Sequence, residues 1–332
     1  MDKLPVVLFI FKRSETLEDI FSQIRKYAPD KLYLIADGGR DEAECLLTKK
    51  TRDKAISLAD WNCEIITNFS DTNVGVYNRI GEGAKWVFSK EEKAIFLEDD
   101  NLPEVTFFQY CADLLTRYEK DERVGWICGT NYLGDSSSFG KESYYYTHHL
   151  LPCGWASWGD KFLKFYDGEL NTLNKKSIKA MKSTYTDNRL FQQELHTIKQ
   201  TRINYLRDPK TVSWDRQMCF SIRSSKIFGI APNKNQIKNI GVDIHSIHGG
   251  NSMNNKMTSR FCEIPTYSLS FPLLAPDKMH FNNDFECKNT NIILYPLFGR
   301  VIRQLGRLIK IICLKNPNDN FPLLNIIKKL KK

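Results

Sequence analysis

Three consecutive carboxylates follow a short apolar run in the first third of the chain. Residues 94–97 are apolar, and Glu98, Asp99 and Asp100 come directly after them. The apolar run is typical of a buried strand, whereas three adjacent like charges repel and are costly to bury. A divalent cation would offset that repulsion, because Mg²⁺ and Mn²⁺ prefer oxygen ligands and often bridge protein carboxylates and substrate phosphates. The alternative is a solvated turn that leads into a helix N-cap.

Apolar strands and amphipathic stretches alternate through the first part of the chain. We expect strands at residues 5–11, 32–36, 63–68, 93–97 and 124–128. We expect helices in the stretches between them, the last at residues 105–118, where apolar residues recur at helical spacing. Strands that alternate with helices imply right-handed crossovers. The sequence therefore predicts an α/β fold whose mostly parallel central sheet is flanked by helices.

Polar residues follow the first four predicted strands. Arg13 follows the first, Asp37 the second, Asn73 the third and the acidic triplet the fourth. Ligands of parallel sheets bind beyond the carboxyl ends of the strands, so we expect these residues to share one site. Arg13 could bind a phosphate; the alternative is a solvated arginine before a helix. Asp37 could bind a base or ribose edge; the alternative is that it only forms the turn. Without a GxGxxG or GxxxxGK[ST] motif, a nicotinamide cofactor and P-loop chemistry are not expected.

Aromatic and histidine-bearing motifs follow in the second half. Trp155 and Trp158 flank small residues after Gly154, an arrangement that suits stacking of a ring on a sugar, with a buried core turn as the alternative. Trp214 and Asp215 open a predicted helix, where Asp215 could also be an N-cap.

A glycine- and histidine-bearing loop covers residues 241–250. His248 is a candidate metal ligand, and the sequence does not decide between His245, His248 or neither. The adjacent pair His148 and His149 would face opposite ways in a strand and could not chelate together.

The basic charge of the chain is concentrated at its C-terminal end. The net charge is +9, and residues 291–332 carry nine basic side chains against one acidic one, or +8. The rest is nearly neutral, so nucleic acid is not an expected partner. Residues 300–312 have an apolar face and a basic face and are too often interrupted by charge to span a bilayer. We expect this tail to lie on an anionic membrane surface, with packing on the body or on a partner protein as the alternative.

Other features of the chain indicate a cytoplasmic protein. The N-terminus leads almost directly into the first predicted strand, without the pattern of a signal peptide. The nine cysteines show no CxxC spacing, and several lie in apolar runs, so we expect reduced thiols and neither disulfides nor zinc.

Seven motifs in order resemble bacterial GT-A glycosyltransferases, the family-2-type enzymes of capsule and O-antigen clusters, and the catalytic domain of animal N-acetylglucosaminyltransferase I. They cover about residues 4–250. They are PVVLFIFKR at 5–13, LIAD at 34–37, NVG at 73–75, IFLEDD at 95–100, LPEVTFF at 102–108, GWASW at 154–158 and WD at 214–215. The resemblance implies a Rossmann-like GT-A fold, a nucleotide-sugar donor and a divalent metal.

The resemblance also implies roles for individual residues. Asp37 would contact uracil, Arg13 the nucleotide or its phosphates, and Asp99 the ribose. Glu98 would lie nearer the sugar, and Asp100 would hold Mn²⁺ or Mg²⁺ against the diphosphate. Asp215 matches the Trp-Asp element that carries the catalytic base in the animal enzyme, although Arg216 and Gln217 replace a further acidic and aromatic pair there.

Together these features predict an inverting, metal-dependent glycosyltransferase that uses a UDP-sugar. Asn73 is expected to assist donor binding, and Gly154, Trp155 and Trp214 to contact the sugar or a saccharide acceptor. We expect a catalytic domain at residues 1–250, a connecting segment at 251–290 and a basic amphipathic tail at 291–332. The tail would hold the enzyme on the inner face of the bacterial cytoplasmic membrane, near a lipid-linked acceptor. The alternatives are a sugar-phosphate nucleotidyltransferase and a non-catalytic sugar-binding protein of the same fold.

Overall fold

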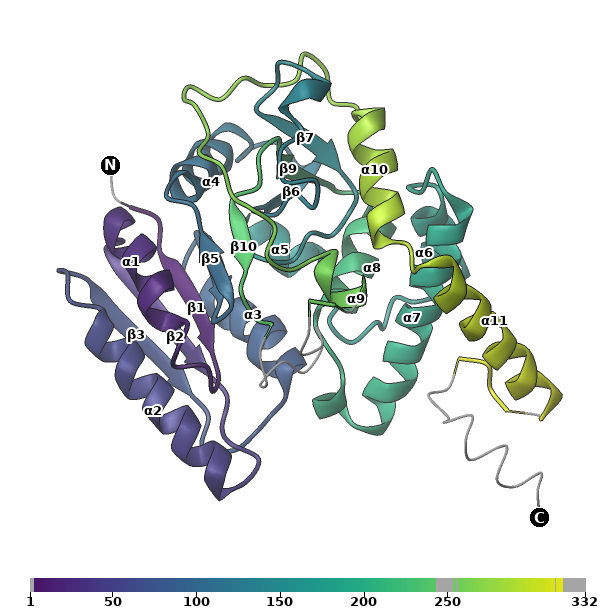
Figure 1. Ribbon diagram of the computed structural model, residues 1–332, viewed down its shortest axis with the longest axis horizontal. Coiled ribbons are helices and arrows are strands. Elements are labelled where there is room, and N and C mark those ends of the chain that lie inside the picture. Colours follow the sequence, from purple (N-terminus) through teal and green to yellow (C-terminus); the bar gives the residue numbers. More distant parts are fainter. Residues whose placement is uncertain (1–2, 243–252, 255, 314, 319–332) are drawn as a thin grey trace.

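The computed structural model describes residues 3–242, 253–254, 256–313 and 315–318 (Figure 1). The strands are β1 (Val6–Ile10), β2 (Lys31–Ala36), β3 (Glu64–Phe69), β4 (Lys93–Glu98), β5 (Asn101–Pro103), β6 (Val124–Cys128), β7 (Tyr144–Thr147), β8 (Trp155–Trp158), β9 (Phe228–Pro232) and β10 (Ile237–Asn239). The helices are α1 (Leu17–Tyr27), α2 (Glu42–Leu58), α3 (Gly83–Phe88), α4 (Thr106–Arg117), α5 (Gly159–Phe165), α6 (Lys175–Lys182), α7 (Asn188–Arg207), α8 (Asp215–Ser225), α9 (Lys256–Ser259), α10 (Asn283–Ile293) and α11 (Leu297–Ile312). Three short helical turns are η1 (Tyr77–Glu82), η2 (Ser137–Phe139) and η3 (Pro209–Thr211).

The central sheet has eight strands in the order β3-β2-β1-β4-β8-β6-β9-β7. Neighbours among β3, β2, β1 and β4 pair in parallel, and β6 pairs in parallel with β9. Strand β8 runs antiparallel between β4 and β6, and β7 runs antiparallel at one edge. Strands β5 and β10 form a separate antiparallel pair. The predicted α/β class and the mostly parallel sheet are confirmed, while β7, β8 and β9 were not predicted to be strands.

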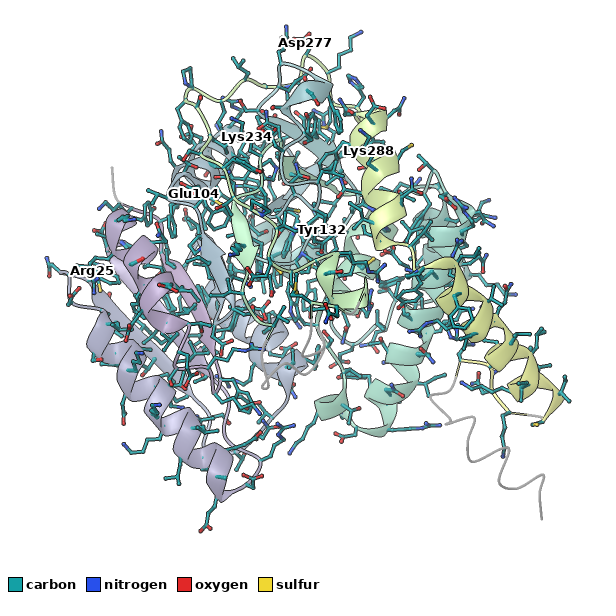
Figure 2. The ribbon with its side chains drawn as sticks, viewed as in Figure 1. Arg25, Glu104, Tyr132, Lys234, Asp277 and Lys288 are labelled. Carbon is teal, nitrogen blue, oxygen red and sulfur yellow. The ribbon has the colours of Figure 1, made fainter. Side chains whose placement is uncertain are left out.

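Both faces of the sheet are covered, and successive residues of β1 show how. Val6, Leu8 and Ile10 join a buried cluster with side chains of α1, α2 and α4. Val7 and Phe9 join a second cluster with side chains of α3, α5 and α8. Because neighbouring residues of a strand point to opposite faces, a strand covered on both sides must be apolar throughout. Side chains fill the space between the layers (Figure 2).

A helical region formed by α6, α7 and α8 packs beside the sheet, and the last two helices follow it (Figure 1). Phe285 of α10 is fully buried in the second cluster. Helix α11 lies at the periphery of the molecule. Within the described ranges, no helix has the length and apolar character needed to cross a bilayer.

The adjacent histidines after β7, His148 and His149, point to different parts of the structure. His149 pairs with Glu286 at 3.1 Å and accepts a hydrogen bond from Arg223. His148 is buried between the rings of Phe228 and Phe281, with centroids 4.8 and 4.9 Å away. This burial, assisted by the charge of Arg223, lowers the pKa of His148 from 6.5 to about 4.

The shifted pKa of His148 predicts acid sensitivity. Between about pH 6.5 and 4 the unfolded chain binds a proton that folded His148 does not, so stability falls as the pH falls through this window. We expect the wild type to lose about 2 kcal/mol more than His148→Phe between pH 7.5 and pH 5. Chemical denaturation of both proteins at the two pH values measures this difference. Equal losses of stability in the two proteins would contradict the prediction. Glu286 and His149 are present in both proteins, so their own contributions to the pH dependence cancel in the comparison.

Candidate functional site

A cleft of about 990 Å³ lies at the carboxyl ends of β1, β2 and β4. One wall contains Arg13, Asp37 and Asn73, and the acidic triplet adjoins it. Trp214 and Asp215 line the same cleft, together with the preceding residues 210–213. The structure therefore brings the polar residues that follow four strands into one cleft, and Asp215 joins them from a distant part of the sequence.

The loop between β1 and α1 holds the acidic triplet in place. Asp99 is 6% exposed, and its Oδ2 accepts a hydrogen bond from the backbone N–H of Phe11 at 2.8 Å. The Nη1 atom of Arg13 lies 3.0 Å from Asp99 Oδ1 and 3.2 Å from Asp100 Oδ2. Arg13 thus compensates part of the negative charge that the sequence places after β4 and fixes two of the three carboxylates relative to each other.

Asn101, which sequence analysis did not single out, links the triplet to Gly154. Its Nδ2 donates to Asp100 Oδ1 at 2.7 Å, and its Oδ1 accepts from the backbone N–H of Gly154 at 2.9 Å. Gly154 has φ +60°, and a Cβ there would lie 2.4 Å from the side chain of Ile237. Gly154 does not line the cleft. Instead of the predicted contact with a sugar, the structure shows a backbone support for Asn101 and hence for Asp100.

Asp37 organises the loop after β3. Its carboxylate accepts hydrogen bonds from the backbone N–H groups of Gly38, Val74 and Gly75, each at 2.9 Å, and from Asn73 Nδ2 at 3.0 Å. These four bonds use the four lone-pair positions of a carboxylate. The direct role of Asp37 and Asn73 is therefore to shape this wall of the cleft, and contact of Asp37 with a uracil would require an exchange of one of these bonds.

Asp215 is the first residue of α8, and its side chain is 27% exposed. Arg216 lies 3.5 Å away, and the charge of Asp215 raises the pKa of that arginine. The preceding residue, Trp214, is 3% exposed and packs near Trp126 and Trp155, so it supports the start of α8. The carboxylate of Asp215 is thus presented to the cleft from a rigid helix start.

Trp155 lies in the middle of the sheet, not on a surface. It is 1% exposed in β8, and its ring stacks on Phe96 with a centroid distance of 3.8 Å and on Trp126 at 4.3 Å. Trp158 is also buried, and its indole N–H donates to the backbone oxygen of Leu115. The prediction that Trp155 stacks on a sugar is wrong for this arrangement; the alternative of buried indoles fits.

Arg79 is a half-buried cation in the cleft wall that sequence analysis missed. It lies on η1, a π-helical turn, and its Nη2 donates to the backbone and side-chain oxygens of Asn68 at 2.6 and 3.0 Å. Its Nε is buried and has no hydrogen-bond partner among the described residues. Burial lowers the pKa of Arg79. Single π-turns occur frequently at functional sites, but an arginine in a helical stretch gives no such signal in the sequence.

The electrostatics of the triplet suit a cation. Removal from water raises the pKa of Glu98 well above its usual range, and the charges of Asp100, Asp99 and Asp215 act in the same direction. Glu98 and Asp100 offer hard oxygen donors to the cleft, which fit Mg²⁺ or Mn²⁺ better than softer metals. Within the part of the chain that the structure describes, however, no group of three or more His, Cys, Asp and Glu side chains is arranged as a complete metal site. The candidate ligands His245 and His248 lie outside the described residues.

No protein-family model matches this sequence, and no curated protein sequence matches it. Among solved structures, the chain is similar to UDP-glucose pyrophosphorylase in complex with UDP-glucose, with a TM-score of 0.36 and 9% identity over 72% of this chain and 94% of that chain. It is also similar to the galactosyltransferase LgtC in complex with donor and acceptor sugar analogues, with a TM-score of 0.35 and 9% identity over 68% and 73% of the two chains. The apo form of UDP-glucose pyrophosphorylase gives a TM-score of 0.36 at 10% identity over 72% and 93%. Similarities this distant define neither a family nor an activity.

Proposed function

We propose that this protein is an inverting, metal-dependent glycosyltransferase that moves a sugar from a UDP-sugar to a hydroxyl of a saccharide acceptor. The observation that carries the proposal is the placement of Asp215 in the same cleft as Arg13 and the acidic triplet. A nucleotide-binding edge of a parallel sheet and a separately anchored carboxylate are the two parts that such a transfer needs. The sequence motifs extend the proposal to the assembly of a bacterial surface polysaccharide.

The donor would occupy the wall formed by the strand ends. Arg13 would contact the nucleotide phosphates, Asp99 the ribose, and the loop held by Asp37 and Asn73 the base. Glu98 would lie nearer the sugar. The size of the cleft, about 990 Å³, is at the upper end of the range of small-molecule sites and leaves room for an acceptor beside the donor.

A divalent cation would be held by Asp100 and by the oxygens of the donor diphosphate, with His248 as a further candidate ligand. Magnesium-type ions are often bound in this way, by one or two carboxylates plus substrate phosphates, so an incomplete set of protein ligands is compatible with metal use. When bound, the ion would supply positive charge that stabilises the leaving diphosphate.

The chain's own residues would carry the rest of the reaction. An acceptor hydroxyl attacks the anomeric carbon of the donor, its proton passes to a carboxylate oxygen of Asp215, and the bond between that carbon and the diphosphate oxygen breaks. Arg13, fixed by Asp99 and Asp100, adds a hydrogen-bond donor to the phosphate side of the cleft. A single displacement of this kind inverts the anomeric centre.

Measurement of product release tests the proposal and separates its alternatives. We expect UDP release from one member of a panel of UDP-sugars, dependent on Mn²⁺ and stimulated by a saccharide acceptor. A nucleotidyltransferase would instead release pyrophosphate from UTP and a sugar phosphate, and a sugar-binding protein would bind without turnover. Absence of UDP release with every donor, in the presence of Mn²⁺, would refute the transferase.

We further propose that α11 places the enzyme on an anionic membrane surface, where a lipid-linked acceptor would be available. The apolar face of α11 points to solvent: Phe298, Leu305 and Ile312 are 77%, 54% and 79% exposed. Gly306 is buried and Arg307 is half-buried, so the opposite face is turned to the body. An exposed apolar helix face bordered by basic side chains is typical of a helix that lies in a membrane interface.

A further inference from the structure

A second pocket, of about 430 Å³, opens where α10 joins α11, and it shares no lining residue with the cleft. Three arginines from separate elements line it: Arg189 in the first turn of α7, Arg260 directly after α9, and Arg300 in α11. Among the described residues, no carboxylate lines this pocket. Its walls therefore concentrate positive charge outside the proposed active site.

Among the described residues, no carboxylate pairs with Arg260 or Arg300. The Nη1 atom of Arg260 donates to the backbone oxygens of Ile292 and Leu294, both at 2.8 Å. The Nε atoms of Arg260 and Arg300 are buried, and within the described ranges neither has a hydrogen-bond partner. Arg189 differs, because Asp187 pairs with it at 2.6 Å. Arg260 and Arg300 are half-buried, so each guanidinium is partly removed from water without a carboxylate partner among the described residues. An anionic ligand would therefore stabilise the arrangement.

The surrounding charges act in the same direction. Removal from water lowers the pKa of Arg260, and the nearby cations Arg216 and Arg303 lower it further. A bound anion would offset both effects. Guanidinium groups bind phosphate oxygens through paired N–H donors, so a phosphate group suits a pocket lined by three arginines.

The pocket is continuous with the apolar face of α11. Leu297 lines the pocket and is 70% exposed, and Phe298 and Val301 continue the exposed apolar surface along the helix. A ligand that fits both features is amphipathic, with a phosphate at one end and acyl chains at the other.

We infer that the arginine pocket binds the phosphate of an anionic phospholipid headgroup while the apolar face of α11 lies among the acyl chains. This inference rests on the membrane placement proposed above and is independent of the transfer reaction. It assigns Arg300 to recognition of the headgroup and distinguishes that residue from the other cations of α11, which would attract the membrane only through their charge.

Co-sedimentation of the full-length protein with vesicles tests the inference. Vesicles of phosphatidylcholine with and without phosphatidylglycerol are the probes, and Arg300→Gln is compared with Arg303→Gln. Arg303 is an exposed cation on the same helix that does not line the pocket. We expect Arg303→Gln to weaken binding to the anionic vesicles about fivefold, as for loss of one surface charge. We expect Arg300→Gln to weaken it about thirtyfold, because a charge-assisted hydrogen bond is also lost.

Three outcomes would overturn the inference, and they are distinguishable. Equal weakening by the two variants would leave the pocket without a role in lipid binding. The second outcome is that inorganic phosphate and dihexanoylphosphatidylglycerol raise the melting temperature of the wild type equally, while the two variants again bind vesicles equally. This outcome would assign the pocket to free phosphate. Failure of the wild type to bind any vesicle would refute the membrane placement itself, and UDP release would still report separately on the transferase.

Discussion

Replacement of Asp100 by asparagine is expected to reduce sugar transfer by about 10³-fold. The substitution keeps an oxygen that can accept from Asn101 but removes the negative charge that the proposed cation needs, and Arg13 retains its contact with Asp99. We therefore expect the folded structure to persist while donor binding loses its dependence on Mn²⁺. Initial rates of UDP release and calorimetric titration with UDP-sugar, each with and without Mn²⁺, measure the two effects.

Asp113→Asn provides the matched control for Asp100. Asp113 is a half-buried aspartate on α4 that does not line the cleft, so this variant removes one carboxylate without touching the site. We expect its transfer rate to stay within about twofold of the wild type. If Asp100→Asn transferred sugar at the wild-type rate with the same response to Mn²⁺, the proposed metal role of the triplet would be wrong.

Replacement of Asp215 by asparagine is expected to lower transfer by about 10² to 10⁴-fold through loss of the general base. Donor binding in the presence of Mn²⁺ should stay within about twofold, because the donor wall is built by the strand ends and not by α8. Asp215→Asn is thus expected to lower kcat, whereas Asp100→Asn is expected to change metal-dependent donor binding as well. Steady-state kinetics with saturating donor, together with titration by UDP-sugar, separates them.

The alternative role of Asp215 is purely structural, since a carboxylate in the first turn stabilises any helix. Asp284 occupies the first turn of α10 and is exposed, so Asp284→Asn measures the cost of losing that helix-terminal charge. We expect Asp284→Asn to lower stability by about 0.5 kcal/mol without loss of transfer. Equal transfer rates for Asp215→Asn and Asp284→Asn would remove Asp215 from the mechanism.

The strands of the first half could be predicted from local pattern because their burial is nearly complete on both faces. Residues of β1, β2 and β4 are apolar almost without interruption, and turn-forming or charged residues follow each of them. The convergence of Arg13, Asp37 and the acidic triplet then follows from a general property of parallel sheets, whose strand ends share one edge. In this region local sequence and tertiary structure agree.

The contribution of β8 could not be predicted in the same way. Four residues with two tryptophans are compatible with a surface turn or a core strand, and only the pairing of β8 between β4 and β6 decides between them. That pairing buries Trp155 and turns Gly154 into a support for Asn101. Contacts between residues this far apart in the sequence carry no local signal.

The amino-acid sequence by itself determined strands β1 to β4 and β6, the acidic tip of β4 and the two-faced character of α11, because each depends on the spacing of neighbouring side chains. Tertiary structure alone decided that Asp215 lines the same cleft as the triplet and that the apolar face of α11 points outward. It also brought Arg189, Arg260 and Arg300 to one pocket. The physical reason is that chain packing, and not local propensity, fixes which distant side chains become neighbours and which faces remain in water.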